Sequence, residues 1–226
     1  ALAEQLARRL ASGQPDLDTR ALAALGPRLD KASLMQRVRI IAEALLAILP
    51  DDGPAAWKII EAILPAPLEP DGKVFNDGYW MLPLAAYWEL RGQADDTAFA
   101  ALEELTQRGT AEFAVRGLIA RDPEGAIRRI GPWVTHPSFH VRRLASEGTR
   151  PYLPWGGKLR VSLEAQAEFL RLITPLAEDP SVYVRKSVGN HVRDWRRIEP
   201  SVADSWIAEA KPPPDVRKLA LPRKGR

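Results

Sequence analysis

Apolar residues recur every three to four positions along most of the chain, and no stretch alternates apolar and polar residues as a strand would. Leu2, Leu6 and Leu10, for example, are spaced i, i+4 and i+8 and share one helix face. Pro, Gly, Ser and Asp residues mark the predicted helix ends. The predicted helices cover residues 1–11, 18–25, 33–49, 55–64, 96–106, 110–121, 123–135, 136–148, 163–177, 180–193 and 198–210. The sequence therefore predicts an all-α protein.

Two segments in the second half of the chain repeat one pattern, HPSFHVRRLASEG at residues 136–148 and DPSVYVRKSVGNH at residues 179–191. The offset between them is constant at 43 residues. Each opens with Pro-Ser, which is typical of a helix start, and continues with a Val-Arg step. Self-similarity at a period of tens of residues indicates stacked units, each too small to bury its apolar face alone. The sequence therefore predicts an α-α superhelix, or solenoid.

The predicted helix of the second copy has two distinct faces, because residues three or four apart lie on the same side. The apolar side carries Val184, Val188, His191 and Trp195. A polar row carries Lys186, Asn190 and Asp194, and its counterpart in the first copy carries Arg143 and Glu147. A solenoid repeats such a row along one surface, so successive helices are expected to line a groove with Arg and Lys. Such a groove suits a phosphate backbone.

Aromatic residues crowd the segment that ends at Gly92. It packs Trp80, Leu84, Tyr87 and Trp88 into two predicted helical turns. Aromatic side chains bury more area than most others, so this density is more typical of a core than of a ligand site.

The composition is that of a folded protein, with 46% hydrophobic and 27% charged residues in 226 positions. No stretch of about 18 apolar residues is free of charge or Pro, so no transmembrane helix is expected.

Because the core of a repeat array grows with repeat number, we expect a single curved domain over residues 1–226. Within it we expect capping helices at 1–54, the repeat array with its groove at 55–210, and a shortened last repeat with a basic tail at 211–226.

The net charge of +3 conceals an asymmetry along the chain. Residues 1–130 hold 15 Lys and Arg against 19 Asp and Glu, whereas the remainder holds 17 against 10. The basic part is the part with the clear repeats, which favours an acidic partner such as nucleic acid, although a solvated basic face gives the same count. The chain has no Cys, which excludes disulfides and thiolate chemistry.

Few residues outside the repeats indicate chemistry by themselves. His136 and His140 are i, i+4 neighbours but too poorly partnered for a metal site, so neither a metal nor a cofactor is expected. Glu112 falls in the first turn of a predicted helix, where the helix dipole and Arg116 at i+4 both favour a carboxylate. Asp194 is followed by further arginines, which predicts a surface ion pair.

A Pro- and Gly-rich loop separates the two copies and carries Trp155 between Pro154 and Gly156. A Trp at a loop tip either packs back onto the protein or contacts a partner.

The stretches TAEFAVR, HPSFHVRRLASEGTRPYLPWGGKL and DPSVYVRKSVGNHVRDW resemble the AlkC branch of the AlkC/AlkD-type DNA glycosylases, which are built from HEAT-like repeats. The resemblance is dense from about Glu104 to Trp195. It implies a HEAT-like solenoid that holds duplex DNA on its concave face. It also implies hydrolysis of the N-glycosidic bond of alkylated purines, 3-methyladenine above all and 7-methylguanine in addition, without base flipping. The expected protein is a bacterial, cytoplasmic, nucleoid-associated base-excision repair enzyme that acts as a monomer without a cofactor.

The same resemblance implies a catalytic set of Glu112, Trp155 and Asp194. An alkylated purine is already cationic and leaves readily, so catalysis must chiefly stabilise an oxocarbenium-like sugar and position water. Two carboxylates and an aromatic face suit that work. The residues expected to hold DNA phosphates are Arg142, Arg143, Arg150, Arg185, Lys186 and Asn190.

Two other functions fit the same repeats. One is a non-catalytic HEAT-like module that binds nucleic acid or a protein partner on the groove, because fold alone does not determine chemistry. The other is a scaffold that never contacts DNA, in which the predicted phosphate ligands pair with neighbouring carboxylates. Any single cation can also be part of a solvated helix face.

Overall fold

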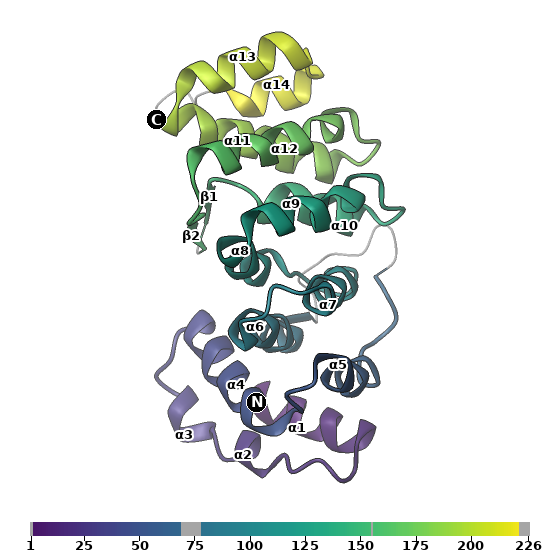
Figure 1. The fold of residues 1–226 in the computed structure, drawn as a ribbon. Helices are drawn as coiled ribbons and strands as arrows, with labels where there is room; N and C mark the ends of the chain where they lie inside the picture. The colour runs from purple at the N-terminus through teal and green to yellow at the C-terminus, as the bar shows by residue number, and fades with distance from the viewer. Residues whose placement is uncertain (1, 69–77, 155, 222–226) are drawn as a thin grey trace. The chain divides into compact units, whose positions relative to one another are not determined.

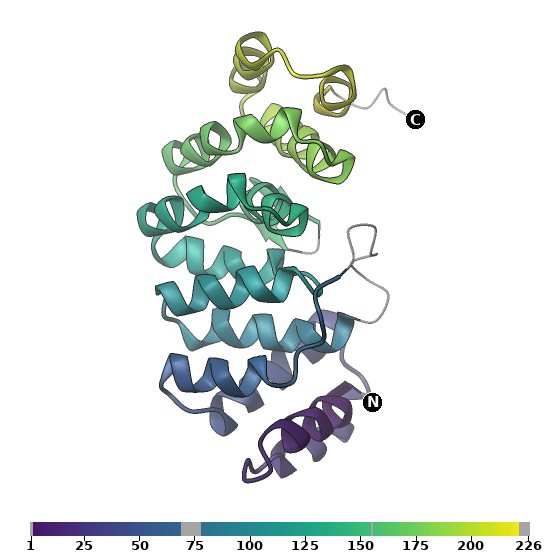
Figure 2. The ribbon, with the colours of Figure 1, turned by 90° about the vertical axis from the view of Figure 1, so that its right-hand side faces the viewer.

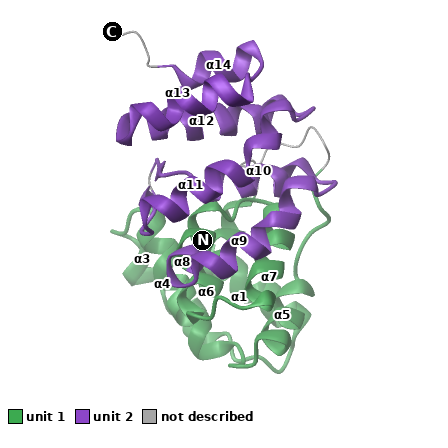
Figure 3. Cartoon of the chain, turned by 45° about the horizontal axis from the view of Figure 1, so that its top comes forward, with its two compact units in different colours: residues 1–117 green, residues 118–226 purple. Residues whose placement is uncertain are grey.

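Almost all regular structure in the computed structural model of the chain is helical (Figure 1). The structure describes residues 2–68, 78–154 and 156–221. The chain forms two compact units, Ala1–Gly117 and Leu118–Arg226, which are described one at a time (Figure 3). The predicted all-α class is confirmed, whereas the single domain and its capping segment remain predictions. The basic tail at residues 222–226 lies outside the described residues. Within the described ranges, no helix has both the length and the apolarity that a membrane span requires.

The first unit is built from helices that pack mainly on near neighbours in sequence. Its elements are α1 (Leu2–Gly13), α2 (Arg20–Ala23), α3 (Gly26–Leu29), α4 (Leu34–Ile48), α5 (Gly53–Glu61), the 3-10 helix η1 (Gly78–Met81), α6 (Leu82–Arg91), α7 (Asp96–Thr106) and the start of α8 (Glu112–Arg121). Helix α4 packs on α6, and α5 packs on α7. Trp88 and Tyr87 are almost fully buried and meet edge to face at a ring-centroid distance of 5.2 Å. The aromatic segment before Gly92 is therefore core, as its density predicts.

The second unit stacks helix pairs in successive layers (Figures 1 and 2). Its elements after α8 are α9 (Pro123–Ile130), η2 (Gly131–Thr135), α10 (Phe139–Gly148), β1 (Tyr152–Leu153), β2 (Gly157–Lys158), α11 (Leu163–Leu172), η3 (Thr174–Glu178), α12 (Val182–Ile198), α13 (Pro200–Ala210) and α14 (Pro214–Ala220). Helix α12 packs on both α10 and α14, while α11 packs on α9. The contact with α14 is close at Gly189, where an added Cβ would lie 2.6 Å from Leu219 Cβ. This unit has the stacked-pair arrangement that the repeats predict.

The Pro-Ser step of each repeat marks the helix start, but the serine hydroxyl is not the cap. Ser138 and Ser181 occupy the N-cap positions of α10 and α12 in extended conformations without a side-chain cap bond. In each copy, the backbone N–H of the serine donates a hydrogen bond to the side chain of the residue two positions earlier. His136 Nδ1 accepts at 3.0 Å in the first copy, and Asp179 Oδ1 accepts at 2.8 Å in the second. The first residue of the repeat pattern thus satisfies a backbone donor that would otherwise be unpaired.

The arginine of the Val-Arg step folds back onto the start of its own repeat. Arg142 Nη1 donates to the carbonyl oxygens of His136 and Pro137, both at 2.8 Å. Its Nε donates to Asp179 Oδ2 at 2.5 Å, and Nη2 donates to Oδ1 at 3.1 Å. Because Asp179 opens the second copy, Arg142 joins one repeat to the next.

Arg185 makes the same contacts one repeat later. Its Nη1 donates to the carbonyl oxygens of Asp179 and Pro180, and its Nε donates to Asp215 Oδ2 at 2.8 Å. Asp215 lies in the first turn of α14. The valines of the two steps, Val141 and Val184, are fully buried. The repeat motif therefore encodes packing and an inter-repeat link.

The connection between the two copies contains a short hairpin that the sequence does not predict. Strands β1 and β2 pair antiparallel, with Tyr152 opposite Lys158 and Leu153 opposite Gly157. Gly157 has a left-handed φ of 69°, which glycine adopts without steric cost. The expectation of no strands is therefore wrong at this point. The strands have only two residues each, too few to show the alternation that predicts a strand.

Proline divides two helices that the sequence predicts as continuous. The predicted helix at 123–135 is α9 followed by η2, and the one at 163–177 is α11 followed by η3. Pro132 and Pro175 open these 3-10 turns and lack the N–H that an α-helix would require.

Candidate active site and nucleic-acid interface

Asp194 lies inside the second unit and not on its surface. Its residue surface is only 1% exposed, so the surface ion pair predicted from its arginine-rich surroundings is wrong. Arg150 Nε donates to Asp194 Oδ2 at 2.8 Å. In the described part of the chain, no group donates a hydrogen bond to the buried Oδ1, and Arg197 Nη1 lies 3.7 Å from it. One oxygen of this carboxylate is thus held while the other keeps its acceptor capacity.

Burial raises the pKa of the Asp194 carboxyl, and the hydrogen bond and charge of Arg150 only partly oppose this shift. A buried carboxylate whose environment disfavours its charge is a recognised mark of a functional site. An unsatisfied buried oxygen in a native structure likewise needs an explanation, of which a bound water or a ligand is one.

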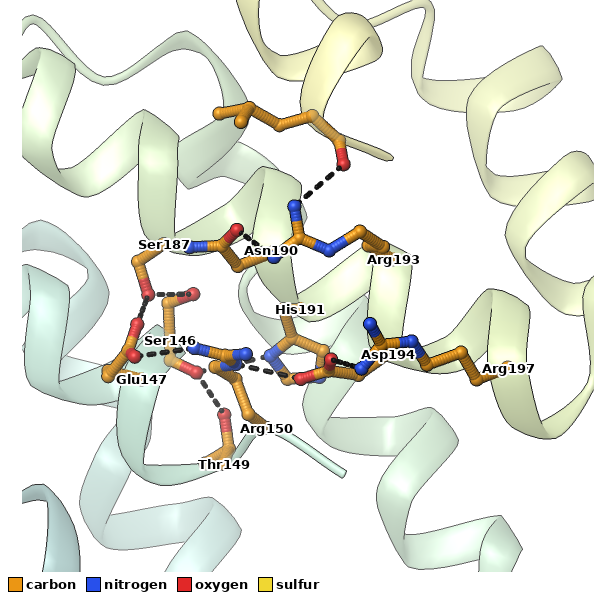
Figure 4. A network of polar contacts seen from close by, with 11 residues as sticks. Ser146, Glu147, Thr149, Arg150, Ser187, Asn190, His191, Arg193, Asp194 and Arg197 are labelled. Atoms are coloured by element: carbon orange, nitrogen blue, oxygen red, sulfur yellow. Dashed lines mark hydrogen bonds and ion pairs between the residues drawn. The ribbon is translucent and has the colours of Figure 1, made fainter. Parts of the chain in front are cut away.

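Arg150 lies between two carboxylates, as Figure 4 shows. In addition to Asp194, it contacts Glu147, where Nη1 donates to Oε1 at 2.6 Å. All three side chains are at most 10% exposed. Arg150 is one of the predicted phosphate ligands, but it is part of a buried cluster, so a phosphate contact would compete with these two carboxylates.

Glu147 is fixed at both of its oxygens. Oε1 accepts from Arg150, and Oε2 accepts from Ser187 Oγ at 2.5 Å. Ser187 Oγ also lies 3.0 Å from Ser146 Oγ, so the contact joins α12 to α10. Burial opposes ionisation of Glu147, but Arg143, Arg150 and the Ser187 hydroxyl together hold the pKa of Glu147 below its ordinary value. Glu147 is therefore an anion at neutral pH.

His191 and Thr149 complete the cluster (Figure 4). His191 is fully buried, with Nδ1 3.1 Å from the carbonyl oxygen of Ser146. Thr149 Oγ1 donates to the carbonyl oxygens of Ala145 and Ser146 at 2.6 and 3.3 Å. These contacts fix the end of α10 and position the turn from which Arg150 projects.

Of the other two predicted catalytic residues, the structure describes one, Glu112. Glu112 begins α8 within the first unit and is 4% exposed, so its carboxylate is buried as well. Trp155 lies outside the described residues. The catalytic roles of Glu112, Trp155 and Asp194 remain predictions.

The predicted phosphate ligands differ in what surrounds them. Arg142 and Arg185 are the inter-repeat links described above, and their guanidinium groups bind carbonyls and carboxylates. Arg143 is buried, and its guanidinium carbon lies 4.8 Å from the centre of the Tyr183 ring. Asn190 is half-buried and accepts from Arg193 Nη2 at 2.5 Å. Their contacts with DNA remain predictions.

Lys186 is exposed on α12, and no carboxylate among the described residues pairs with it. It is therefore the predicted phosphate ligand whose charge is most available to DNA.

Replacing Lys186 with Ala is expected to reduce the slope of log K against log salt by about 0.9 for duplex DNA. Fluorescence anisotropy at several salt concentrations measures this slope. Lys218→Ala, an exposed lysine of α14 outside the predicted set, is the control. A slope for Lys186→Ala equal to that of the native protein would remove Lys186 from the interface.

Sequence reasoning missed the partners inside the cluster. Ser146 and Ser187 are fully buried, and a buried hydroxyl needs a partner. Arg142, Arg143 and Arg150 lie three or four positions from Ser146, so its local sequence is typical of an exposed face and does not mark it as buried. The described residues contain no group of three or more potential metal ligands from His, Cys, Asp and Glu.

The stacked pairs of the second unit and the helical first unit define an all-α helical-repeat protein. No family model matches the chain. A relative, the uncharacterized protein YhaZ of Bacillus subtilis, is 35% identical over 213 residues, which cover 91% of this chain and 57% of the relative. The solved structure of the Pseudomonas fluorescens alkylpurine DNA glycosylase AlkC, bound to DNA containing an abasic site analog, is similar with a TM-score of 0.80 and 31% identity. That similarity covers 97% of this chain and 61% of the AlkC chain.

The resemblance to the AlkC branch is thereby confirmed, and the chain is AlkC-like. It spans about three fifths of the length of these two relatives.

Proposed function

We propose that the protein is a DNA glycosylase that hydrolyses the N-glycosidic bond of alkylated purines in duplex DNA. The observation that carries the proposal is Asp194, a buried carboxylate with one oxygen held by Arg150 and the other without a hydrogen-bond donor among the described residues. Similarity to an alkylpurine DNA glycosylase solved with DNA supports the same class of reaction. The proposed substrate is 3-methyladenine first and 7-methylguanine second, without base flipping.

The chemistry needs little proton transfer to the base, because the alkylated purine leaves as a neutral molecule. The bond between the purine N9 and the sugar C1′ breaks with both electrons going to the base. The sugar becomes oxocarbenium-like, water adds at C1′, and the water then loses a proton. A carboxylate stabilises the cationic sugar and accepts that proton. We assign these tasks to Asp194 and Glu112, and we assign stacking against the damaged nucleotide to Trp155.

Asp194 is 1% exposed, so a DNA sugar reaches it only when the surface above it opens. We propose that DNA binding brings about this opening. A carboxylate kept from bulk water interacts more strongly with a developing cation than an exposed one does. The proposed enzyme needs no cofactor, acts as a monomer and works on cellular DNA in the cytoplasm.

The test is single-turnover release of 3-methyladenine from methylated duplex DNA, measured by chromatography of the free base. We expect the native protein to release the base well above the spontaneous rate of the same DNA. Release at the spontaneous rate, combined with salt-dependent DNA binding, would instead establish a non-catalytic binding module. If the protein neither releases base nor binds DNA, the scaffold function is the one that remains.

A further inference from the structure

Arg150 contacts Asp194 with a single hydrogen bond, although arginine and carboxylate groups frequently pair through two. The guanidinium presents a planar fork that can hold both oxygens of one carboxylate. Here Nε binds Oδ2, and Oδ1 receives no hydrogen bond from the described residues. Some other contact must therefore orient the guanidinium.

Glu147 provides that contact from α10. The 2.6 Å hydrogen bond from Arg150 Nη1 to Glu147 Oε1 holds a second nitrogen of the guanidinium, in addition to the Nε that binds Asp194. Glu147 is itself held in place, because Ser187 on α12 donates to its second oxygen and the charge of Arg143 stabilises its carboxylate. With both ends bound, the guanidinium has no freedom to turn toward Asp194 Oδ1.

We infer that Glu147 is a positioning residue for the proposed glycosylase reaction: it restricts Arg150 to one contact with Asp194, so that the buried Oδ1 keeps its acceptor capacity for water or the sugar once DNA binding opens the site. This inference rests on the proposed function. Glu147 touches neither substrate nor reacting atoms, and it acts through Arg150. Without it, Arg150 is expected to turn and bind both oxygens of Asp194.

Two conservative variants separate geometry from charge. Glu147→Asp keeps the charge but withdraws the carboxylate by about 1.5 Å, the length of one carbon–carbon bond. Glu147→Gln keeps the length and an acceptor for Arg150 but removes the charge. Because a displacement of about 1 Å can cost 100-fold in rate, we expect Glu147→Asp to slow single-turnover base release roughly 10- to 100-fold. We expect Glu147→Gln to retain a rate within about threefold of the native protein, because it preserves the placement on which the rate depends.

DNA affinity and a matched control distinguish positioning from a general loss of structure. Both variants are expected to bind duplex DNA with native affinity. The control is Asp179→Asn, which alters another buried carboxylate paired with an arginine of the same unit and is expected to leave the rate unchanged. A crystal structure of Glu147→Asp gives a readout that does not depend on activity. We expect it to show Arg150 bound to both oxygens of Asp194.

The outcomes separate the two proposals. If the native protein releases base but Glu147→Asp releases it equally fast, or Arg150 keeps a single contact in that variant, the positioning role is wrong while the glycosylase proposal stands. If Glu147→Gln is the slower of the two, the charge of Glu147 matters and its placement does not, which also overturns the inference. If the native protein releases no base, the proposed function fails first.

Discussion

Replacing Asp194 with Asn is expected to slow base release about 100- to 1000-fold, the usual effect of removing one preorganised electrostatic group from an active site. The amide keeps the shape of the side chain and can still accept from Arg150 Nε, so the geometry around it persists. What disappears is the negative charge beside the developing sugar cation and the acceptor for the proton of water. Single-turnover release by Asp194→Asn, compared with the native protein at equal DNA saturation, measures the loss.

The same substitution is not expected to lower thermal stability. Because burial raises the pKa of Asp194 in the folded protein, its contribution to folding is present below the unfolded pKa and is lost as pH rises through the folded value. At any pH above the folded value the ionised carboxylate therefore disfavours folding, and a neutral amide removes that cost. A melting temperature at pH 7.5 equal to or above the native one is expected. A clear fall would show that Asp194 serves the fold and would count against a catalytic role.

The protonation of Asp194 also predicts how the native rate depends on pH. The carboxylate must be ionised to stabilise a cation, so base release should decline as pH falls through the raised pKa of Asp194. The rate of Asp194→Asn should lack this decline, provided that spontaneous release is subtracted at each pH.

Replacing Asp179 with Ala is expected to cost about 3–5 kcal/mol of unfolding free energy, because it leaves the Arg142 guanidinium without its buried partner. The side chain of Asp179 is 2% exposed and that of Arg142 is 14% exposed, so solvent can replace little of the lost interaction. The variant also removes the acceptor for the Ser181 backbone N–H at the start of α12. Urea denaturation measures the change.

Asp204→Ala is the matched control for that experiment. Asp204 pairs with Arg196 at 2.5 Å, but its side chain is 64% exposed, and exposed pairs contribute about 0–1 kcal/mol. If the two variants lose the same free energy of unfolding, Asp179 is not a link between repeats, and Arg142 becomes available again as a phosphate ligand.

The helices could be predicted from the sequence because each depends on local spacing and end signals. Helix α7 begins and ends where the spacing predicts, at Asp96 and Thr106. The predictions erred where a single proline changed the helix type, as at Pro132, or where a two-residue strand left no periodic signal. Boundary signals of this kind act on one or two residues and are easily overridden by neighbouring turns.

The candidate site could be predicted only in part, because its electrostatics depend on partners distant in sequence. Asp194 reads as a surface residue beside Arg197, yet its main partner, Arg150, is 44 residues away. Arg142 and Lys186 look alike in sequence as cations of the repeats, but one is bound by a buried aspartate and the other is exposed. Nothing local distinguishes these cases, since side-chain partners across a helix pair are set by tertiary packing.

The links between repeats have a direction. Each arginine of the two Val-Arg steps pairs with an aspartate at the start of a later helix, Arg142 with Asp179 before α12 and Arg185 with Asp215 in the first turn of α14. The segment that starts at Asp179 therefore accepts a link from the preceding repeat and donates one to the next. If a second copy of this segment were inserted directly after the first, its aspartate would meet the arginine of the preceding copy, and its arginine would meet the aspartate of α14. The fold thus contains a unit that gene duplication can add without redesigning its neighbours, a physical route by which such arrays change length.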